Sequence, residues 1–417
     1  MSGTFSAGGF SHSEHVSGNG PRVVISGIGM AGPGGWDRET FWEFLKRGER
    51  GVRWLPWPGL PACESNTNPP RTAGAPLPNL PGQSLSSAAD RMRELARQTA
   101  AEAIADSGLV PADHDRTRWG IVIGTSKGAM PVAGDLTWTW PHQPATEVAR
   151  QWDVQGPNLC PVAACATGLV CLWRGAELIR RGECDVVLAG SVDASLQEIL
   201  LAAYRRMGVL AKINDDPGSA CRPYDRERSG FLVGEGGAMF VLESATSARA
   251  RGIKPYAEFI SGAILSDCSG MTDLSAEAEP LQVLLRRVLQ LGQITPAQID
   301  LACLHGTATL PNDRYETVAL RRVFGEEMDR IPCFGLKGAI GHLLGAAGSV
   351  ETAAGLLALR DRVVPPTVNW VNPDPNCDLK FRRVGQSEGP RRFDHLLKVS
   401  LGFGGHLAAA VFRRWES

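Results

Sequence analysis

Three side chains suited to nucleophilic and acid–base chemistry lie in glycine- and alanine-rich segments of this 417-residue chain. Cys165 lies in VAACATG, His305 in HGTAT and His342 in KGAIGHLLGAAG. A cysteine thiolate is a nucleophile, and an imidazole can donate a hydrogen bond or move a proton. Small neighbours leave room for a substrate to reach such groups. The three segments therefore indicate a covalent catalytic site.

Each of these residues also has a structural interpretation. A buried, inert thiol is the better account of the other nine cysteines, but a helix expected directly after Cys165 would favour its thiolate. A lone histidine after a strand is more often structural than catalytic. Two histidines in small-residue turns after apolar runs favour function, because ligands bind outside the carboxyl ends of parallel strands.

Strands and helices expected to position these residues alternate along the chain. Strands are expected over residues 23–26, 119–124, 185–189, 238–242, 257–260 and 300–304, and helices over 87–107, 169–181, 280–291, 315–324 and 349–359. Residues 398–401 are expected to begin a glycine-rich turn before a final strand. Gly27-Ile28-Gly29 is expected to form a turn, and the proline-rich residues 54–83 a surface excursion. The alternation predicts parallel sheets covered by helices on both faces, in two similar halves that suit an internal duplication.

Composition and charge exclude several classes of protein. Hydrophobic residues make up 43% and charged residues 21% of the chain, which is typical of a globular protein and excludes wholesale disorder and fibrous classes. The net charge of −1 provides no global field for nucleic acid or anionic lipid. The 48 glycines exceed the usual share and indicate many tight turns.

The expected location is the cytoplasm. Residues 1–20 are small and polar, so we expect a disordered tail and no secretory signal. The longest charge-free run, residues 154–173, contains Gln155, Asn158 and two prolines, so no membrane span is expected. The ten cysteines show no CxxC spacing and do not cluster with histidines, which indicates reduced thiols and no metal site.

Five segments in one order resemble the β-ketoacyl-acyl carrier protein synthases, the condensing enzymes of fatty acid and polyketide synthesis. They are VAACATG, RPYDRERSGFLVGEGG, HGTATLPNDRYET, KGAIGHLLGAAGSVE and LGFGGH. The resemblance runs from about Val23 to Phe412, and a Cys-His-His set with a lysine five residues before the second histidine is similar to the elongating branch. It implies a thiolase-like, five-layered α-β-α-β-α fold from two duplicated halves. Residues 21–260 would carry the cysteine, and residues 261–417 both histidines.

The resemblance also implies roles for the reacting residues. Cys165 would accept the acyl group. His305 and His342 would donate hydrogen bonds to the thioester carbonyl of the malonyl unit and stabilise the enolate formed by decarboxylation. Lys337, paired with Glu351, would orient this network, although the ion pair alone has a structural interpretation.

Further matched positions would surround the reacting carbon. Backbone N–H groups of Cys165 and Phe403 would hold the oxyanion, with Phe403 acting as a gate in the turn that contains Gly402 and Gly404. Thr307 and Thr309 would line the passage for the phosphopantetheine arm, and Phe231 would lie beneath the site. Asp313 and Glu316 would brace the loop after His305. Arg205 and Arg206 would form a docking point for an acidic carrier protein. A pair of arginines on a helix is also often only solvated.

The chain departs from this family in places. The segment between Thr125 and Cys165 is shorter than expected and contains Trp138 and Trp140, which would shorten the acyl pocket or pack in a dimer interface. Gly270 stands where the family often has histidine, and Ala308 where glycine or serine is common.

The expected function is that of a discrete condensing enzyme that joins malonyl-acyl carrier protein to an acyl chain and releases carbon dioxide. It would bind no cofactor of its own, would take both substrates from phosphopantetheine on an acyl carrier protein, and would form a homodimer or a heterodimer with a second synthase-like subunit.

Two alternative functions stay open. A non-catalytic chain-length-factor-like subunit would replace the nucleophilic cysteine, which is present here. A Cys-His acyltransferase or hydrolase would need only one general base and a water path.

Overall fold

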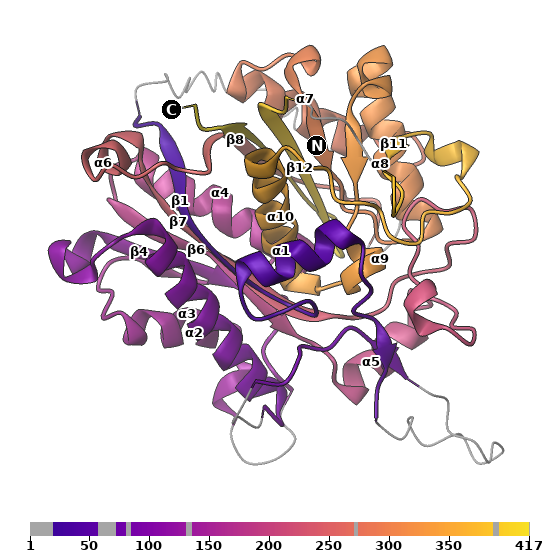
Figure 1. Cartoon of the computed structure of the whole chain (residues 1–417), viewed down its shortest axis with the longest axis horizontal. Helices are drawn as coiled ribbons and strands as arrows, with labels where there is room; N and C mark the ends of the chain where they lie inside the picture. Colours follow the sequence, from indigo (N-terminus) through magenta and orange to yellow (C-terminus); the bar gives the residue numbers. More distant parts are fainter. Residues whose placement is uncertain are drawn as a thin grey trace, which may run out of the picture.

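The computed structural model describes residues 20–56, 72–80, 85–130, 136–270, 274–386 and 392–416 (Figure 1). The expected tail, apart from Gly20, and much of the proline-rich segment 54–83 lie outside these ranges. Within them, the principal strands join one mixed sheet of eleven strands, and a separate two-stranded sheet contains β2 (Arg53–Trp54) and β3 (Ala73–Gly74).

The first half of the chain contains five strands of the large sheet. These strands are β1 (Val23–Ala31), β4 (Trp119–Gly124), β5 (Asn158–Leu159), β6 (Val186–Ala194) and β7 (Glu235–Ser244). The helices of this half are α1 (Arg38–Arg47), α2 (Ala88–Ser107), α3 (Gln143–Gln151), α4 (Thr167–Arg180), α5 (Glu198–Arg206) and α6 (Ala245–Ala250).

The second half contains six strands of the large sheet. These strands are β8 (Ala257–Ser266), β9 (Leu301–Cys303), β10 (Pro332–Phe334), β11 (Lys380–Phe381), β12 (His395–Gly402) and β13 (His406–Arg414). The helices of this half are α7 (Glu279–Gly292), α8 (Leu310–Phe324), α9 (Lys337–Ile340) and α10 (Ala347–Asp361).

The order of the strands repeats between the halves. The first half has the order β5-β4-β6-β7-β1, and the second has β10-β9-β12-β13-β8 with β11 added at the edge. Parallel and antiparallel neighbours also correspond at every position. We propose on this basis that two copies of one unit make up the chain. The expected boundary between residues 260 and 261 falls within β8, the first strand of the second copy.

The prediction of parallel sheets is correct for only part of each half. The strands β5, β4 and β6 are parallel in the first half, and β11, β10, β9 and β12 in the second, but β7 and β13 run antiparallel to both of their neighbours. A parallel connection needs a crossover helix packed on the sheet. β12 and β13 are instead joined by a tight turn, and α5, which lies between β6 and β7, buries only Leu201.

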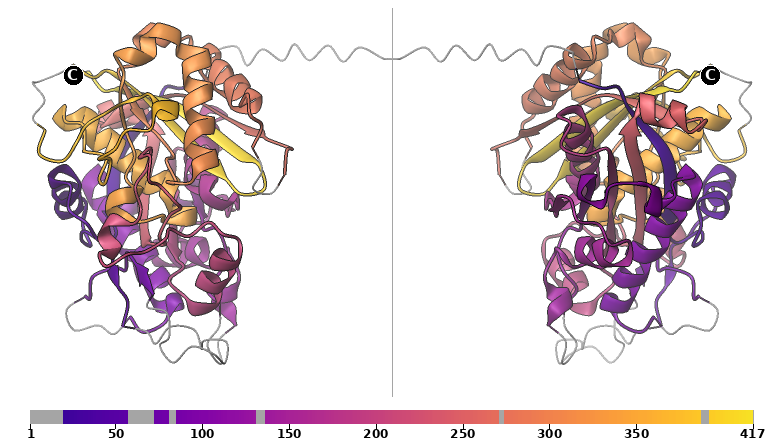
Figure 2. Two further views of the ribbon diagram at one scale, coloured as in Figure 1. Left: turned by 90° about the vertical axis from the view of Figure 1, so that its right-hand side faces the viewer. Right: turned by 90° about the vertical axis from the view of Figure 1, so that its left-hand side faces the viewer.

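The layers of the fold follow from the faces that the helices bury. α4 and α10 contact each other and lie between the two parts of the sheet, which meet where β1 pairs with β8 (Figure 2). α10 is buried along residues 347–359, as expected for a helix that is apolar all round. α2 and α3 cover one outer face, and α7 and α8 the other. This arrangement is the expected five-layered α-β-α-β-α fold.

Glycines permit the close contacts between these layers. A Cβ on Gly168 of α4 would lie 2.3 Å from the backbone nitrogen of Ser349 in α10. Gly27 and Gly29 do not form the expected turn, because β1 continues to Ala31. A Cβ on either residue would lie about 2 Å from a carbonyl oxygen of α2, at Ala103 or Thr99 (2.1 and 2.0 Å).

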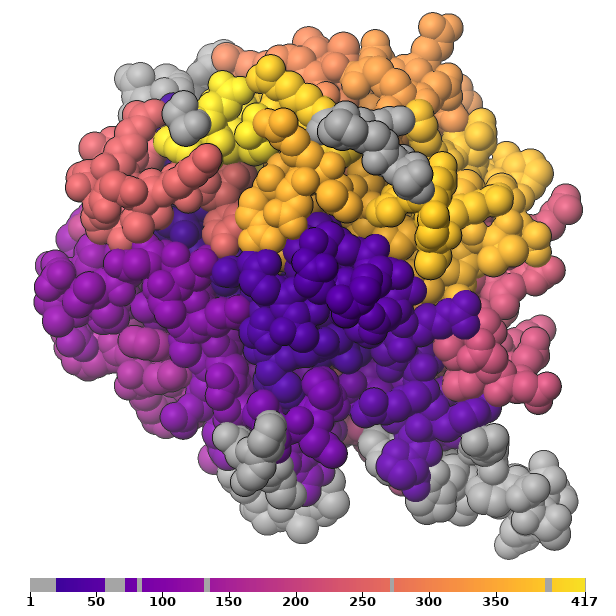
Figure 3. All heavy atoms as spheres, viewed as in Figure 1, coloured from indigo at the N-terminus to yellow at the C-terminus, as the bar shows by residue number. Residues whose placement is uncertain are grey.

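The two halves pack against one another across the face in Figure 3, where indigo to magenta atoms adjoin orange to yellow ones. Of the helices in the described ranges, none has both the length and the apolar character needed to cross a membrane. The nine cysteines in those ranges are free thiols.

Candidate active site

Cys165 lies in a strained turn at the start of the central helix α4. After β5 the chain forms a short 3₁₀ turn, η4 (Ala164–Ala166), and Ala164 has a left-handed φ of 47°. The Thr167 hydroxyl stabilises this turn by donating to the Ala164 carbonyl at 2.7 Å and accepting from the Ala163 N–H at 2.9 Å. Such strain persists only where the surroundings enforce it, and it clusters at functional sites.

His305 follows β9 in a loop that α8 fixes. The Glu316 carboxylate accepts the backbone N–H groups of His305 and Gly306, each at 2.7 Å. The Tyr224 hydroxyl donates to the same carboxylate at 2.9 Å. Asp313 lies next to these hydrogen bonds. It accepts the Tyr224 N–H at 2.8 Å and pairs with Arg228 at 3.4 Å.

His342 follows α9 through Gly341, whose φ of 67° is left-handed. Its backbone N–H donates to the Leu232 carbonyl at 2.6 Å. The Phe231 ring meets the imidazole edge-on, with ring centroids 4.9 Å apart. This contact limits the orientations that the imidazole can take.

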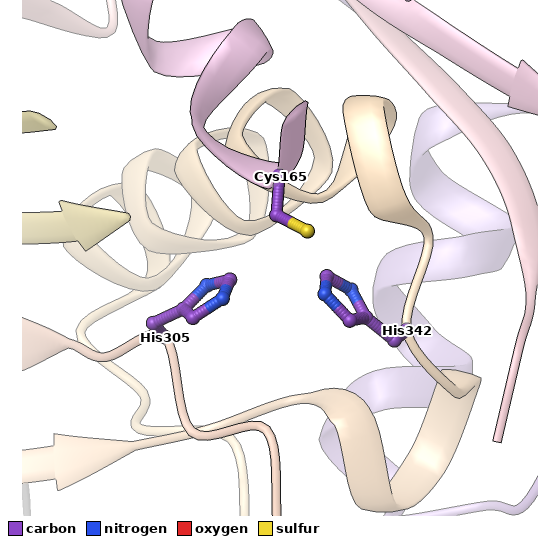
Figure 4. A group of neighbouring side chains, drawn as sticks. All are labelled: Cys165, His305 and His342. Atoms are coloured by element: carbon purple, nitrogen blue, oxygen red, sulfur yellow. The ribbon is translucent and has the colours of Figure 1, made fainter. Parts of the chain in front are cut away.

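These three segments bring their reactive atoms together (Figure 4). The Cys165 sulfur and one ring nitrogen from each of His305 and His342 all lie within 4.8 Å of one another. All three residues are at most 4% exposed. One half of the fold supplies the sulfur and the other supplies both imidazoles, so the site forms only when the halves pack.

Hydrogen bonds assign the same tautomer to both imidazoles. The Leu344 N–H donates to Nδ1 of His342 at 3.2 Å, and the Lys337 ammonium lies 3.3 Å from Nδ1 of His305. An ammonium has only hydrogen to offer, so Nδ1 accepts in both residues. A neutral imidazole then carries its proton on Nε2, and His305 and His342 are both hydrogen-bond donors at that atom.

A buried ion network lies next to His305. Lys337 pairs with Oε1 of Glu351 and also donates to the His305 carbonyl. Lys398 in β12 pairs with the other oxygen of Glu351 at 2.8 Å. Sequence reasoning missed Lys398, whose only signal is a lysine inside the apolar strand segment LLKVSL.

Burial and these cations determine the charge of the two histidines. Burial lowers the pKa of both imidazoles well below the ordinary value, and the ammonium groups of Lys337 and Lys398 lower it further. Lys127 acts in the same direction on the pKa of His342. Both imidazoles are therefore neutral at physiological pH.

Burial shifts the pKa of the Cys165 thiol upward, because the charged form of this group is the deprotonated one. It raises the pKa of Cys165 to about 11, although Lys337, Lys127 and the nearby Phe403 backbone N–H act to lower it. The helix start alone was expected to favour the thiolate. Loss of solvent outweighs that effect, so the resting site holds a thiol.

The three side chains line a cavity of about 540 Å³. Its walls include Phe231, Thr307, Thr309, Gly402 and Phe403. The two threonine hydroxyls are hydrogen-bonded to each other at 2.9 Å.

A glycine turn after β12 closes one side of the cavity. A Cβ on Gly402 would lie 2.6 Å from the Ala163 carbonyl oxygen, and Gly404 and Gly405 have left-handed φ angles of 80° and 79°. Phe403, between Gly402 and Gly404, is half-buried. The turn therefore places Phe403 in the cavity wall, packed against the cluster that contains Cys165.

Other residues singled out in the sequence lie apart from the three reactive atoms. Arg205 and Arg206 are exposed at the end of α5. Trp138 packs against Ala88 and Met92 of α2, away from the cavity lining. Trp140 is 61% exposed. Gly270 lines the cavity, and Ala308 has a left-handed φ of 61°, the conformation that glycine adopts at no cost.

Cys165, His305 and His342 have the sulfur and nitrogen donors that Zn²⁺ takes. Metal-bound imidazoles need an unprotonated ring nitrogen facing the ion, however, and here the Nδ1 atoms are engaged by Lys337 and the Leu344 N–H. The donor set therefore fits hydrogen donation to a substrate better than metal binding.

Two family models match the chain. "Beta-ketoacyl synthase, N-terminal domain" matches residues 21–248, and "Beta-ketoacyl synthase, C-terminal domain" matches residues 256–371.

Curated relatives match over nearly their whole length. The tetracenomycin polyketide synthase ketoacyl synthase alpha subunit of Streptomyces glaucescens is 36% identical over 94% of this chain and 97% of its own. 3-Oxoacyl-[acyl-carrier-protein] synthase 2 of Coxiella burnetii is 30% identical over 94% of this chain and 98% of its own.

Solved structures share the fold. A type II polyketide synthase acyl carrier protein in complex with its ketosynthase bound to the hexaketide contains a chain with a TM-score of 0.85, 28% identity and coverage of 95% and 100%. The ishigamide ketosynthase/chain length factor gives a TM-score of 0.82 at 26% identity, with the same coverage.

Proposed function

The chain belongs to the β-ketoacyl synthase family, and from that premise we propose that it condenses an acyl group held on Cys165 with a malonyl group held on an acyl carrier protein. The activity class is a 3-oxoacyl-[acyl-carrier-protein] synthase of polyketide or fatty acid synthesis. One observation carries the proposal: the Cys165 sulfur and two neutral imidazoles converge within 4.8 Å in one cavity.

Acylation comes first. The Cys165 sulfur attacks the thioester carbonyl of an acyl-carrier substrate, and the C–S bond to the carrier breaks. The thiol proton of Cys165 leaves with the carrier thiol, so the step needs no other reactant. The N–H groups of Cys165 and Phe403 would hold the tetrahedral oxyanion, which is supported by the approach of Phe403 to the sulfur.

Decarboxylation then supplies the carbon nucleophile. The malonyl thioester carbonyl would accept Nε2–H from both His305 and His342. As the C–C bond to the carboxylate breaks, the electron pair moves onto this thioester oxygen as an enolate, and carbon dioxide leaves. Two preorganised donors in a dry cavity stabilise the developing charge more than the ground state.

Condensation completes the cycle. The enolate carbon attacks the acyl-Cys165 carbonyl, the C–S bond breaks, and the released thiolate takes a proton from solvent. Lys337 and Glu351 act through His305 by holding its tautomer. Glu316 positions the same residue through its backbone, and Asp313 braces the neighbouring Tyr224.

The substrate arm would enter past Thr307 and Thr309, which line the cavity beside Phe403. We propose that Phe403 is the gate that admits it, since the two left-handed glycines that follow it, Gly404 and Gly405, allow the turn to move. The chain supplies no cofactor chemistry in this scheme, because phosphopantetheine arrives with the substrate.

Arg205 and Arg206 are proposed to meet the acidic carrier protein, because both are exposed on α5, near the cavity residue Met207. Reversing both charges should raise the KM for a carrier-bound acyl group and leave that for a pantetheine thioester unchanged. Arg286 and Arg287, an exposed pair on α7, provide the matched control. Equal KM changes from the two double variants would refute this docking site.

The proposed assembly is a two-fold dimer. β5 is the edge strand of the large sheet, and Trp140 and Val162 near it are 61% and 49% exposed. Exposed apolar surface beside an unpaired strand edge is typical of a protein interface. Relatives named as an alpha subunit and a ketosynthase/chain length factor support a heterodimer with a second synthase-like chain, and a homodimer is the alternative.

The non-catalytic alternative is not favoured, because a chain-length factor lacks the nucleophile and this chain places Cys165 between two histidines. A hydrolase needs a general base, whereas both imidazoles here present a proton at Nε2.

Intact-mass analysis after incubation with acyl-carrier thioesters tests the first step. The expected result is a mass gain of one acyl group, mapped to Cys165 and absent from Cys165→Ala. No acylation across short, long and aromatic acyl donors would overturn the proposal.

A further inference from the structure

A second buried lysine shares the carboxylate that holds Lys337. Lys398 projects from β12, is fully buried, and donates to Oε2 of Glu351 at 2.8 Å and to the Val399 carbonyl. Lys337 occupies Oε1 of the same carboxylate. Figure 1 shows β12 beside α10, the helix that carries Glu351.

The three groups carry an excess of positive charge. Two ammonium groups surround one carboxylate, and none of the three residues is more than 1% exposed. A single lysine would neutralise Glu351. The second therefore adds one positive charge to a region from which water is excluded, where charges interact strongly.

The fold itself does not require this charge. Leu344, with φ 49°, begins the 3₁₀ turn before α10, as Ala164, with φ 47°, begins the one before α4. Counted from these two residues, Glu351 and Cys171 occupy the same position on their helices, and Cys171 is an uncharged, buried thiol. The half that supplies neither active-site histidine thus has an uncharged residue at this helix position.

We propose that Lys398 is a positioning residue for condensation: it fixes Glu351 and Lys337 beneath His305 and supplies the extra positive charge that keeps both imidazoles neutral donors. This inference rests on the proposed function. It concerns the protonation state of the histidines, whereas acylation of Cys165 is a separate step.

The charges near the two imidazoles shift the pKa values of these histidines in the direction that this role requires. Lys398 lowers the pKa of both His305 and His342, as does Lys337. Among the described residues, other charged or titratable groups near the two imidazoles are Lys127, Cys165, Asp193, Glu316 and Glu351. The Glu316 carboxylate binds the His305 backbone. Removing Lys398 changes the net charge of the lysine–glutamate group from positive to neutral, so both histidines would protonate at a higher pH.

Carbon dioxide release from malonyl-carrier, measured against pH in Lys398→Met, tests this role. Activity requires neutral imidazoles and is lost as pH falls through their pKa. We expect the acid limb of the variant to move up by about one pH unit. Lys398→Arg should restore the limb, and Lys380→Met, the same change at an exposed position on β11, should leave it in place.

The inference would be overturned if folded Lys398→Met lost carbon dioxide release at the same acidic pH as the wild-type protein. If Lys398→Met does not fold, titration of ¹⁵N-histidine-labelled wild-type protein decides, because protonation of both imidazoles above about pH 6 would contradict a site held neutral. Acylation of Cys165 by mass separates the two claims. If the wild-type protein is never acylated, the proposed function is refuted. If it is acylated but the pH profile of Lys398→Met does not shift, only the role of Lys398 is refuted.

Discussion

At the scale of single residues, the site depends on hydrogen-bond partners that fix tautomers. The Nδ1 atoms of His305 and His342 face Lys337 and the Leu344 N–H, respectively. Each imidazole therefore presents a proton at Nε2. The chemistry that follows is donation to an oxygen that becomes negative, and no other arrangement of protons suits these partners.

His305→Ala and His342→Ala should each lower the rate of malonyl-carrier decarboxylation by about 10²–10³-fold, the usual effect of removing one donor to a developing oxyanion. Acylation of Cys165 should fall much less, since the enolate does not form in that step. Carbon dioxide release and intact mass on the same samples measure the two effects. Wild-type condensation by both variants would contradict the enolate account.

Alkylation of Cys165 should depend steeply on pH. Burial raises the pKa of its thiol to about 11, so the thiolate fraction grows as pH rises toward that value. The rate of iodoacetamide labelling should increase about tenfold per pH unit between about pH 7 and 9. Cys165→Ala corrects for labelling of the other cysteines. A plateau below about pH 8 would show that the thiolate is already present at neutral pH.

The sequence could predict the residues that lie in recognisable turns. Cys165, His305, His342 and Lys337 stand within small-residue segments that follow strands or precede helices. Lys398 could not be found in this way. A lysine in a strand is usually solvent-facing, and its partner Glu351 lies on a helix elsewhere in the chain, so only the packed structure reveals the ion pair.

At the scale of helices and strands, the central helices determine where the sulfur lies. α4 and α10 cross where Gly168 meets Ser349. A 3₁₀ turn that begins at a left-handed residue precedes each helix: Ala164, next to Cys165, and Leu344, two residues after His342. The prediction of a turn at Gly27 and Gly29 was wrong, because both residues lie within β1. Glycine in a strand also permits a helix to approach, and nothing local distinguishes that use from a turn.

Gly168→Ala should lower the free energy of unfolding by about 2 kcal/mol, within the usual cost of overpacking a core. Its Cβ would lie 2.3 Å from a backbone nitrogen that cannot move without moving α10. Gly335→Ala is the matched control, because the first atoms met by its Cβ are 3.6 Å away. Chemical denaturation of both variants measures the difference, and equal stabilities would contradict the close crossing.

At the scale of the whole molecule, the site joins two halves with the same strand order. The first contributes Cys165 and the second His305 and His342, so the duplication places a nucleophile and its donors on opposite sides of one interface. Strand and helix alternation predicted two similar halves, and the repeated strand order agrees with that. It could not predict the antiparallel β7 and β13, because direction depends on whether a connection crosses the sheet.

Trp140→Glu should dissociate the proposed dimer, because it would place a charge in apolar surface beside the edge strand β5. Light scattering should then report a mass near the 44.6 kDa of one chain. Val384→Glu alters a residue that is likewise exposed (51%) but lies after β11, and should leave the assembly intact. A Trp140→Glu protein with wild-type mass would place the interface elsewhere.

Condensation itself is tested most directly with malonyl-carrier labelled separately at its free carboxyl carbon and at C2, added to protein already acylated on Cys165. The account predicts that the carboxyl label leaves as carbon dioxide, that the C2 label appears in a 3-oxoacyl-carrier product, and that Cys165 returns to its unmodified mass. Each acyl group lost should match one carbon dioxide and one product. Release of free carboxylic acid from Cys165, with both labels retained on the malonyl-carrier, would show a hydrolase and contradict the account.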